Sequence, residues 1–350
     1  MRALTVVAGR ADSMAVSDVP EPEPAADEIL VRGLAVGVCG TDREIAAAEY
    51  GEAPPGREHL VIGHESLGRV VSAPENSGFD TDDYIVGIVR RPDPEPCGAC
   101  ARGEFDMCRN GRYTERGIKG LDGYASQQWV VPTEYAVKVP ATLGDLGILV
   151  EPASVLAKAW DQIDAVGNRS WFAPESVLVT GAGPIGLLAA MFGVQRGLDV
   201  HVLDRVEDGP KPRLVEALGA TYHHEDMRDL AGRLEPDIVI EATGAPAVIT
   251  PALTVTGPYG IVCVTGVSTP GRTTRVDMGE VNREIVLDND VVIGSVNANR
   301  RHYAGAVDAL AAADRDWVAR LISRRVPLSD FAEAFAPLED DVKVVITIDG

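Results

Sequence analysis

A glycine-rich turn near the middle of the chain constrains the fold more than any other stretch. The apolar run over residues 177–180 is typical of a buried strand, and an apolar helical pattern begins at residue 187. Between them lies Gly-Ala-Gly-Pro-Ile-Gly, which fits G-x-G-x-x-G with a strand before it and a helix after it. The three glycines suit a tight turn, close approach of a pyrophosphate to the backbone, and close helix–strand packing. Alone, the pattern is equally consistent with a ligand-free connection. As a dinucleotide site it would use Gly181, Gly183, Pro184, Ile185 and Gly186.

The segments after this turn favour the dinucleotide interpretation. Residues 199–203 are typical of a second strand, which ends at Asp204, close to the roughly 20-residue spacing expected for a carboxylate that binds the adenosine ribose. Further buried strands are expected at 237–241 and 260–264, with helical or turn-rich stretches between them. This alternation predicts an α/β fold with a doubly wound parallel sheet, the Rossmann arrangement.

Length and charge narrow the class of protein. A chain of 350 residues suggests two domains, and no apolar run reaches the 18 or more residues of a membrane span. Asp and Glu total 53 against 32 Lys and Arg, and the net charge of −21 disfavours nucleic acid and anionic membranes as partners. Five cysteines are few for a disulfide scaffold, so we expect a cytoplasmic location.

The scarcity of lysine, with only five in the chain, resembles the acidic proteins of salt-loving archaea. We therefore expect stability to rise with KCl, because salt screens the repulsion between surface carboxylates. Thermal melts at low and molar KCl test this, and a melting temperature that does not move would reject it. An ordinary acidic enzyme is the alternative.

The first 150 residues differ from the middle of the chain. Short strand-like runs are separated by Pro- and Gly-rich turns, which is typical of an irregular β-rich domain. A helical pattern then starts at Glu151, and the tail shows a short helix at 330–335 and a strand at 342–348. We expect residues 1–157, completed by 305–350, to form one domain, and 158–304 to form the nucleotide domain.

Four residues of the first half carry ligand atoms that Zn²⁺ accepts, namely Cys39, His64, Glu65 and Glu151. Three such ligands leave one position for water or substrate. Taken singly, each has a simpler explanation: a lone cysteine is most often a small buried apolar residue, and Gly-His-Glu can be an ordinary turn.

Several motifs, in this order, resemble the zinc-dependent medium-chain dehydrogenases over nearly the whole chain. They are Cys39-Gly40-Thr41-Asp42, Gly63-His64-Glu65, Glu151-Pro152 and the glycine-rich turn. The nearest resemblance is to the archaeal glucose dehydrogenase branch, through the segments 89–92, 113–118, 283–287 and 293–297. The resemblance implies a β-rich, GroES-like catalytic domain beside the Rossmann domain.

The same resemblance implies roles for individual residues. Cys39, His64 and Glu151 would bind zinc, with Glu65 as an exchanging ligand or as a partner of the ligands. Thr41 would pass the proton outward, Glu115 and Asn297 would contact the sugar or the nicotinamide, and Glu151 would also border the substrate. A turn hydroxyl and a surface carboxylate are the plainer interpretations of Thr41 and Glu115.

Two departures from the family pattern leave alternatives open. Cys97, Cys100 and Cys108 fall as C-x2-C-x7-C, whereas the family's structural zinc lobe has four cysteines and this chain has Pro94 at the remaining position. Either Asp93 or Glu95 completes a second zinc site, or packing alone holds the lobe. Asp288 stands where the branch often has a histidine, which weakens the inference about the sugar.

The cofactor signals are mixed. Asp204 favours NAD because it accepts from the 2′-hydroxyl and repels a 2′-phosphate, whereas Arg205, Lys211 and Arg213 can receive that phosphate. The family branch tends to accept both, so we expect use of NAD and NADP.

We therefore expect a zinc- and NAD(P)-dependent oxidation of an aldose, with D-glucose to its lactone as the leading case. A polyol or secondary-alcohol dehydrogenase of the same family is the alternative, a zinc-free quinone reductase is a further rival, and a non-catalytic nucleotide-binding regulator is the last. Relatives assemble through the nucleotide domain, often by a strand near residues 291–293, so a homodimer or homotetramer is expected.

Overall fold

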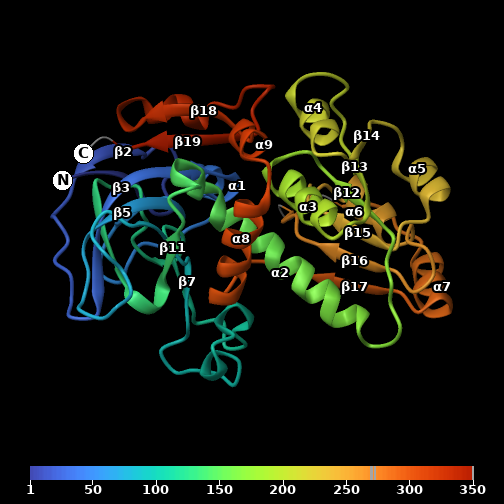
Figure 1. Cartoon of the computed structure of the whole chain (residues 1–350), viewed down its shortest axis with the longest axis horizontal. Helices are drawn as coiled ribbons and strands as arrows, with labels where there is room; N and C mark the ends of the chain where they lie inside the picture. The colour runs from blue at the N-terminus through green and yellow to red at the C-terminus, as the bar shows by residue number, and fades with distance from the viewer. Residues whose placement is uncertain (269–270, 272, 349–350) are drawn as a thin grey trace. The chain divides into compact units, whose positions relative to one another are not determined.

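The glycine-rich turn follows an inner strand of an open parallel sheet in the computed structural model, which describes residues 1–268, 271 and 273–348. In spatial order its strands are β14 (Thr221–His223), β13 (Asp199–Leu203), β12 (Ser176–Thr180), β15 (Ile238–Glu241), β16 (Ile261–Val264) and β17 (Val291–Gly294) (Figure 1). Strand β12 runs into Gly181 and lies between β13 and β15, where the strand order reverses. This switch point is where open α/β sheets bind their ligands. The predicted doubly wound fold is confirmed.

The helices that accompany this sheet follow from local signals. Helix α3 starts with Pro184 directly after Gly183, and most of its residues are buried, as its apolar sequence predicts. Asp226 and Asp277 cap the following helices by accepting backbone N–H groups. The helices of this part are α2 (Val150–Gly167), α3 (Pro184–Gln195), α4 (Pro210–Ala217), α5 (Met227–Leu234), α6 (Pro246–Ala252) and α7 (Met278–Asp288).

The β-rich part contains a mixed sheet whose centre is the long strand β3. Its path runs through β11 (Ala136–Val139), β6 (Tyr84–Gly87), β5 (Glu65–Ser72), β3 (Glu28–Val38), β19 (Lys343–Thr347) and β18 (Ile322–Pro327), with β10 (Gln128–Pro132) also on β3. The C-terminal strand β19 pairs antiparallel with β3, so the red end of the chain lies beside the blue N-terminal strands in Figure 1. The last strand of the chain thus belongs to the same sheet as the strands of the N-terminal part.

Two smaller sheets and several short helices complete this part. The sheets are β2 (Ala15–Asp18), β1 (Arg2–Val7) and β4 (His59–Val61), and β7 (Arg90–Arg91), β8 (Thr114–Arg116) and β9 (Gly120–Leu121). The helices are α1 (Gly40–Ala46), α8 (Arg300–Ala312), α9 (Arg315–Arg320), α10 (Phe331–Phe335) and the 3₁₀ turns η1 (Cys100–Arg102), η2 (Phe105–Met107), η3 (Thr133–Tyr135), η4 (Gly144–Leu149) and η5 (Leu328–Asp330). Apolar side chains from β3, β5, β10 and β19 fill the core.

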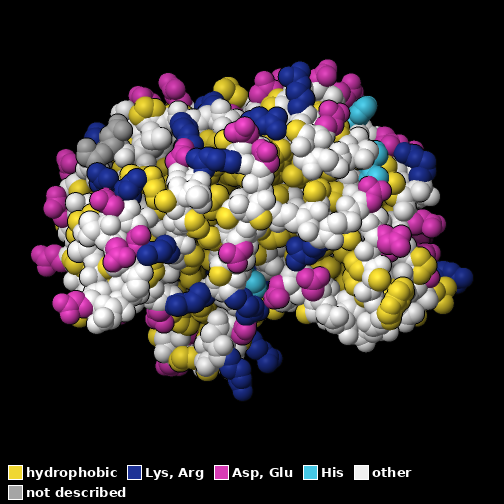
Figure 2. Space-filling model, viewed as in Figure 1, with side chains coloured by type: hydrophobic (Ala, Val, Ile, Leu, Met, Phe, Trp, Pro, Cys, Tyr) yellow, Lys and Arg dark blue, Asp and Glu magenta, His cyan; other side chains and the backbone are white. Residues whose placement is uncertain are grey.

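The chain divides into two units, residues 1–154 with 297–350 and residues 155–296. We call them the β-rich unit and the nucleotide unit. The sequence predicts these two boundaries after residues 157 and 304, which are three and eight residues later in the chain. Among the described residues, no helix is long and apolar enough to cross a membrane. On the face seen in Figure 2, carboxylates are scattered over the surface rather than gathered in one patch.

Candidate metal and dinucleotide sites

The structure brings Cys39 and His64 into direct contact. Cys39 follows β3 and caps α1, and His64 lies in the turn just before β5, with Gly63 at φ +87°. The Sγ atom of Cys39 is 3.1 Å from Nε2 of His64. Neighbouring strands β3 and β5 therefore deliver a thiol and an imidazole from two distant sequence positions to one point.

Asp42 orients both of these residues. One carboxylate oxygen accepts the backbone N–H of Cys39 at 2.9 Å, and the other lies 3.4 Å from Nδ1 of His64. Asp42 is itself 1% exposed, so its position is set by the surrounding packing. A carboxylate on the far nitrogen of a histidine holds the ring so that Nε2 faces the ligand position.

Glu65 completes a cluster of three ligand types, because its carboxylate, the Cys39 thiol and the His64 imidazole lie within 4.8 Å of one another. Both Glu65 oxygens also accept from Nζ of the buried Lys343 at 2.6 Å. Gly37 makes room for this carboxylate, since a Cβ at that position would collide with it. The place of Glu65 within this cluster supports its role as a ligand, and its ion pair with Lys343 supports its role as a partner of the ligands.

Glu151 lies in the first turn of α2 and is 9% exposed, but its carboxylate is outside the cluster of three. Burial raises its pKa to about 7, with His64 and Lys343 opposing the rise and Glu65 adding to it. Its carboxylate makes no hydrogen bond with any residue that the structure describes. A buried carboxyl group without a donor is a natural ligand for a cation.

The donors fit a divalent cation. Burial opposes a charged imidazole, yet the charges of Cys39 and Asp42 raise the pKa of His64 well above its ordinary value. The cluster therefore attracts a positive charge at the place where an ion would sit. Thiolate, imidazole and carboxylate are the donors that zinc prefers, and Cys39, His64 and Glu151 would hold it.

Glu115 and Asn297, which were expected to contact the sugar, are hydrogen-bonded to each other. Nδ2 of Asn297 donates to Oε1 of Glu115 at 2.7 Å, although the residues are 182 positions apart. The turn after Glu115 packs on the turn that carries His64, because a Cβ on Gly117 would lie 2.6 Å from the Gly63 carbonyl oxygen. Thr41 is the second residue of α1, two positions after Cys39, and is partly exposed.

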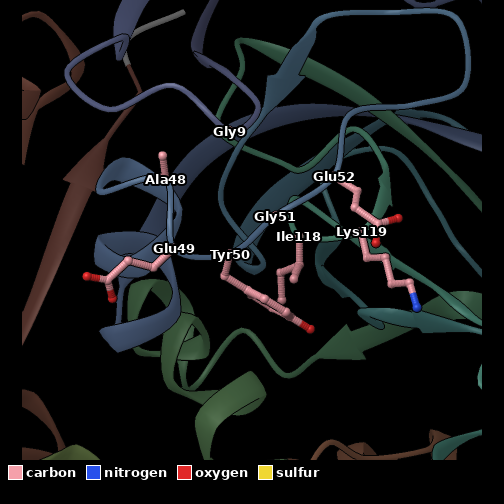
Figure 3. A pocket seen from close by; sticks show the side chains of 8 residues that line it. All are labelled: Gly9, Ala48, Glu49, Tyr50, Gly51, Glu52, Ile118 and Lys119. Carbon is pink, nitrogen blue, oxygen red and sulfur yellow. The ribbon is translucent and has the colours of Figure 1, made fainter. Parts of the chain in front are cut away.

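A shallow hollow of about 280 Å³ lies beside α1, and none of the expected ligands lines it. Figure 3 shows Glu49 pointing away from the side on which Tyr50, Glu52 and Lys119 lie. Burial raises the pKa of Tyr50, and the charge of Glu115 raises it further. Tyr50 lines this hollow together with Ile118 and Lys119, which follow the strand that carries Glu115, and sequence reasoning missed it.

The three cysteines of residues 97–108 also come together within 4.8 Å. Neither carboxylate that was expected to complete this site joins them. Asp93 accepts the backbone N–H of Glu95 and Nε of Arg112, and the Glu95 carboxylate accepts from the same guanidinium. Backbone hydrogen bonds from Arg109 and Cys100 lower the pKa of Cys97 to about 6.

We expect one zinc ion per chain from the cluster around Cys39, because the three-cysteine lobe has no fourth ligand among the described residues. Elemental analysis of the purified protein measures the ratio. The Cys108→Ala variant is the control, and its zinc content should equal that of the wild type. Two zinc ions per wild-type chain, falling to one in the variant, would contradict the expectation.

The nucleotide unit contains a larger cavity of about 780 Å³ at the end of β12. Gly181 has φ +91°, which favours glycine, and a Cβ on Gly186 would lie 1.7 Å from the Gly181 carbonyl oxygen. A Cβ on Gly183 would meet nothing within 4 Å, so the backbone there faces open space. With the first N–H groups of α3 lacking helical partners, this arrangement fits a pyrophosphate.

Asp204 lines this cavity together with Arg205 and Lys211. One of its oxygens accepts the Ala182 N–H at 2.6 Å, and the other accepts the N–H of Arg205 at 2.7 Å. Asp204 therefore holds the glycine-rich turn in place, a role that its spacing alone did not predict. Arg228 also lines the cavity and adds a cation that the sequence reasoning did not include.

Sequence reasoning also missed Lys343, Arg90 and Asp42, of which only Asp42 is close in the sequence to the residue that it contacts. Lys343 could have been noticed as the only lysine in the apolar pattern of the last strand. Arg90 belongs to a segment that the sequence analysis marked, but its pairing with Glu115 required the strand pairing of β7 and β8. Asp42 follows Cys39 by three residues and had a signal as a capping carboxylate.

Two known families match most of the chain. The family described as the glucose dehydrogenase C-terminus matches residues 144–348, which is more than half of the chain. The alcohol dehydrogenase GroES-like domain matches residues 25–141.

Individual relatives cover the whole chain. It is 39% identical to the glucose 1-dehydrogenase of Methanocella arvoryzae, over 99% of both chains. It is 36% identical to that of Halobacterium salinarum, over 98% of this chain and 99% of the relative. The solved structure of Haloferax mediterranei glucose dehydrogenase with NADP, Zn and gluconolactone is similar at a TM-score of 0.92, with 34% identity over 100% of both chains.

Proposed function

This chain belongs to the archaeal glucose 1-dehydrogenase branch of the zinc-dependent medium-chain dehydrogenases, and from that premise we propose that it oxidises D-glucose at C1 to the lactone. A nicotinamide dinucleotide accepts the hydride. One observation carries the proposal: a Cys39 thiol and a His64 imidazole 3.1 Å apart, beside buried carboxylates, in a chain whose curated relatives are glucose 1-dehydrogenases.

Each residue around the metal position has a different role in the proposed reaction. Cys39, His64 and Glu151 would hold Zn²⁺, which when bound polarises the sugar hydroxyl and favours loss of its proton. Asp42 keeps the His64 ring turned toward the ion, and Thr41 passes the released proton outward. Lys343 binds both oxygens of Glu65 and holds this carboxylate beside the ligands, which would leave one coordination position open for the substrate.

The other residues orient the sugar and the cofactor. Glu115 accepts hydrogen bonds from sugar hydroxyls, and Asn297 can both accept and donate such bonds. These hydrogen bonds fix which carbon of the sugar faces the nicotinamide. The backbone of Gly181, Gly183 and the α3 N-terminus binds the pyrophosphate. The nicotinamide supplies the hydride acceptor, and the protein supplies position and polarity.

We expect both NAD and NADP to be used. Backbone N–H groups of Ala182 and Arg205 donate to the two oxygens of Asp204, which reduces the repulsion between this carboxylate and a 2′-phosphate. The cations of Arg205, Lys211 and Arg228 line the same cavity. Initial rates with each cofactor at several concentrations give the ratio of kcat/KM. A preference beyond about a thousandfold, roughly 4 kcal/mol, would contradict dual use.

Initial rates on a panel of glucose, galactose, xylose and sorbitol, before and after chelation, test the function. We expect activity on glucose that chelation removes and zinc restores. Activity on sorbitol but on no aldose would replace the proposal by a polyol dehydrogenase. Activity that chelation leaves untouched would favour the zinc-free quinone reductase chemistry.

We also propose that the protein is a homo-oligomer and works in the cytoplasm. Strand β17 ends the parallel sheet with one edge unpaired among the described residues, and Val286, Leu287 and Val292 expose apolar side chains on α7 and on this strand. All five cysteines are free thiols, which suits a reducing compartment. Light scattering of the purified protein would distinguish monomer, dimer and tetramer.

A further inference from the structure

Arg90 and Glu115 are directly opposite each other on two paired strands. In the register of β7 and β8, Arg90 pairs with Glu115, and both side chains are buried, with 7% and 6% exposed. Nε and Nη2 of Arg90 donate to Oε1 of Glu115 at 3.1 and 2.9 Å. Two segments that are separate in the sequence thus form one buried ion pair.

The two oxygens of Glu115 have different surroundings. Oε1 accepts from both Arg90 nitrogens and from Nδ2 of Asn297, three N–H donors in all. Oε2 makes no hydrogen bond with any described residue, and it is not among the described polar atoms that are sealed from solvent without a partner. Glu115 therefore presents one open acceptor atom from an otherwise enclosed carboxylate.

The Arg90 side chain cannot turn toward a ligand without losing its own contacts. Nη1 donates to the backbone carbonyl oxygen of Asp106 at 3.0 Å, and the guanidinium lies 3.8 Å from the centre of the Tyr113 ring. Stacking fixes the plane of the group, and the three nitrogens all face protein acceptors. Arg90 thus acts through Glu115 rather than on a substrate.

We propose that Arg90 is the positioning residue of the sugar site: it saturates Oε1 of Glu115 so that Oε2 alone faces the substrate, as an acceptor for one hydroxyl. An ion-paired carboxylate has no proton to donate, so this position selects a hydroxyl donor and disfavours an anionic group. The inference rests on the proposed sugar oxidation and adds the element that sets its specificity. It predicts that a sugar lacking that hydroxyl binds weakly.

Arg90→Met tests this with the substrate that the wild-type chain oxidises best, whether aldose or polyol. We expect KM to rise and kcat/KM to fall by about 10- to 100-fold with kcat changed much less, because a binding contact to a charged acceptor is weakened. Arg91→Met is the matched control: this neighbour also stacks on a tyrosine, Tyr135, but donates only to backbone carbonyls. Its KM should stay at the wild-type value.

A double-mutant cycle shows whether Arg90 acts through Glu115. Glu115→Gln should raise KM by a similar factor, and adding Arg90→Met to it should change KM by less than about threefold. A series of deoxy sugars identifies the hydroxyl that Oε2 accepts from. The sugar that lacks this hydroxyl should bind the wild type much more weakly than the parent sugar does, whereas Glu115→Gln should bind the two sugars almost equally. Effects of the two substitutions that multiply would overturn the inference.

If Arg90→Met does not fold, Arg90→Lys decides. Lysine keeps the charge but cannot make the two-pronged contact, so an intermediate KM supports the inference and an unchanged KM overturns it. If the wild type oxidises only sorbitol in the substrate panel, glucose oxidation is rejected. The same variants, assayed with sorbitol, still show whether Arg90 acts on KM through Glu115. The two failures are therefore distinguishable.

Discussion

Replacing Cys39 with alanine is expected to lower kcat/KM for the sugar by about a thousandfold or more. The thiol lies 3.1 Å from the His64 imidazole, and its loss leaves a neutral methyl group where zinc needs an anionic ligand. A bound metal stabilises the developing charge by several kcal/mol, and each 1.4 kcal/mol is a factor of ten. Zinc content should fall together with the rate.

Two measurements distinguish loss of the ion from loss of the fold. Elemental analysis should find about one zinc ion fewer per chain, while circular dichroism and cofactor binding stay as in the wild type. Cys108→Ala, which removes a thiol from the three-cysteine lobe, should keep the wild-type rate. A Cys39→Ala protein that retains both its zinc and its rate would remove Cys39 from the ligand set.

The nucleotide unit could be predicted in detail because its signals are local. The strand, the glycines and the helix of residues 176–195 are adjacent in the sequence, and Gly181 and Gly186 each meet a backbone requirement that arises within a few residues. Gly181 takes a left-handed conformation, and Gly186 passes against the Gly181 carbonyl. Short-range geometry of this kind leaves a pattern that a single sequence can show.

The sites of the β-rich unit depend on contacts that no local pattern contains. Asn297 and Glu115 were each expected near the sugar through family resemblance, but their mutual hydrogen bond spans 182 residues. Arg90 reaches Glu115 only because β7 and β8 pair in one register, and a shift by one residue would turn its side chain to the other face. Strand pairing, not residue type, makes these groups neighbours.

For charged residues too, the sequence predicts the position of the side chain but not the partner that it contacts. The acidic spacing that predicted Asp204 located a carboxylate at the end of β13, but not its hydrogen bond to the Ala182 N–H. Similarly, the apolar pattern at the end of the chain predicts strand β19 but not the contact that Lys343 makes within it. A charge in an apolar strand is the available signal, since burying it requires a partner somewhere in the fold.

Replacing Lys343 with methionine is expected to destabilise the β-rich unit by about 3–5 kcal/mol. Lys343 is 2% exposed, and its Nζ contacts both oxygens of Glu65 at 2.6 Å and the Val38 carbonyl oxygen at 3.2 Å. Methionine fills much of the same volume, so the loss comes mainly from the Glu65 carboxylate, which stays buried without its cation. For a unit of this size the melting temperature should fall by roughly 10 °C.

A surface ion pair of the same length provides the control. Lys138 contacts Asp83 at 2.6 Å, but the two side chains are 44% and 24% exposed, so Lys138→Met should change stability by less than about 1 kcal/mol. Adding Glu65→Gln to Lys343→Met removes the unpaired charge and should recover much of the loss. If zinc accepts the released Glu65 carboxylate, the loss will be smaller in zinc-loaded protein than after chelation. Equal effects of the Lys343 and Lys138 substitutions would mean that the buried ion pair stabilises the protein no more than an exposed one. The pairing with Lys343 would then not explain why Glu65 does not bind the metal.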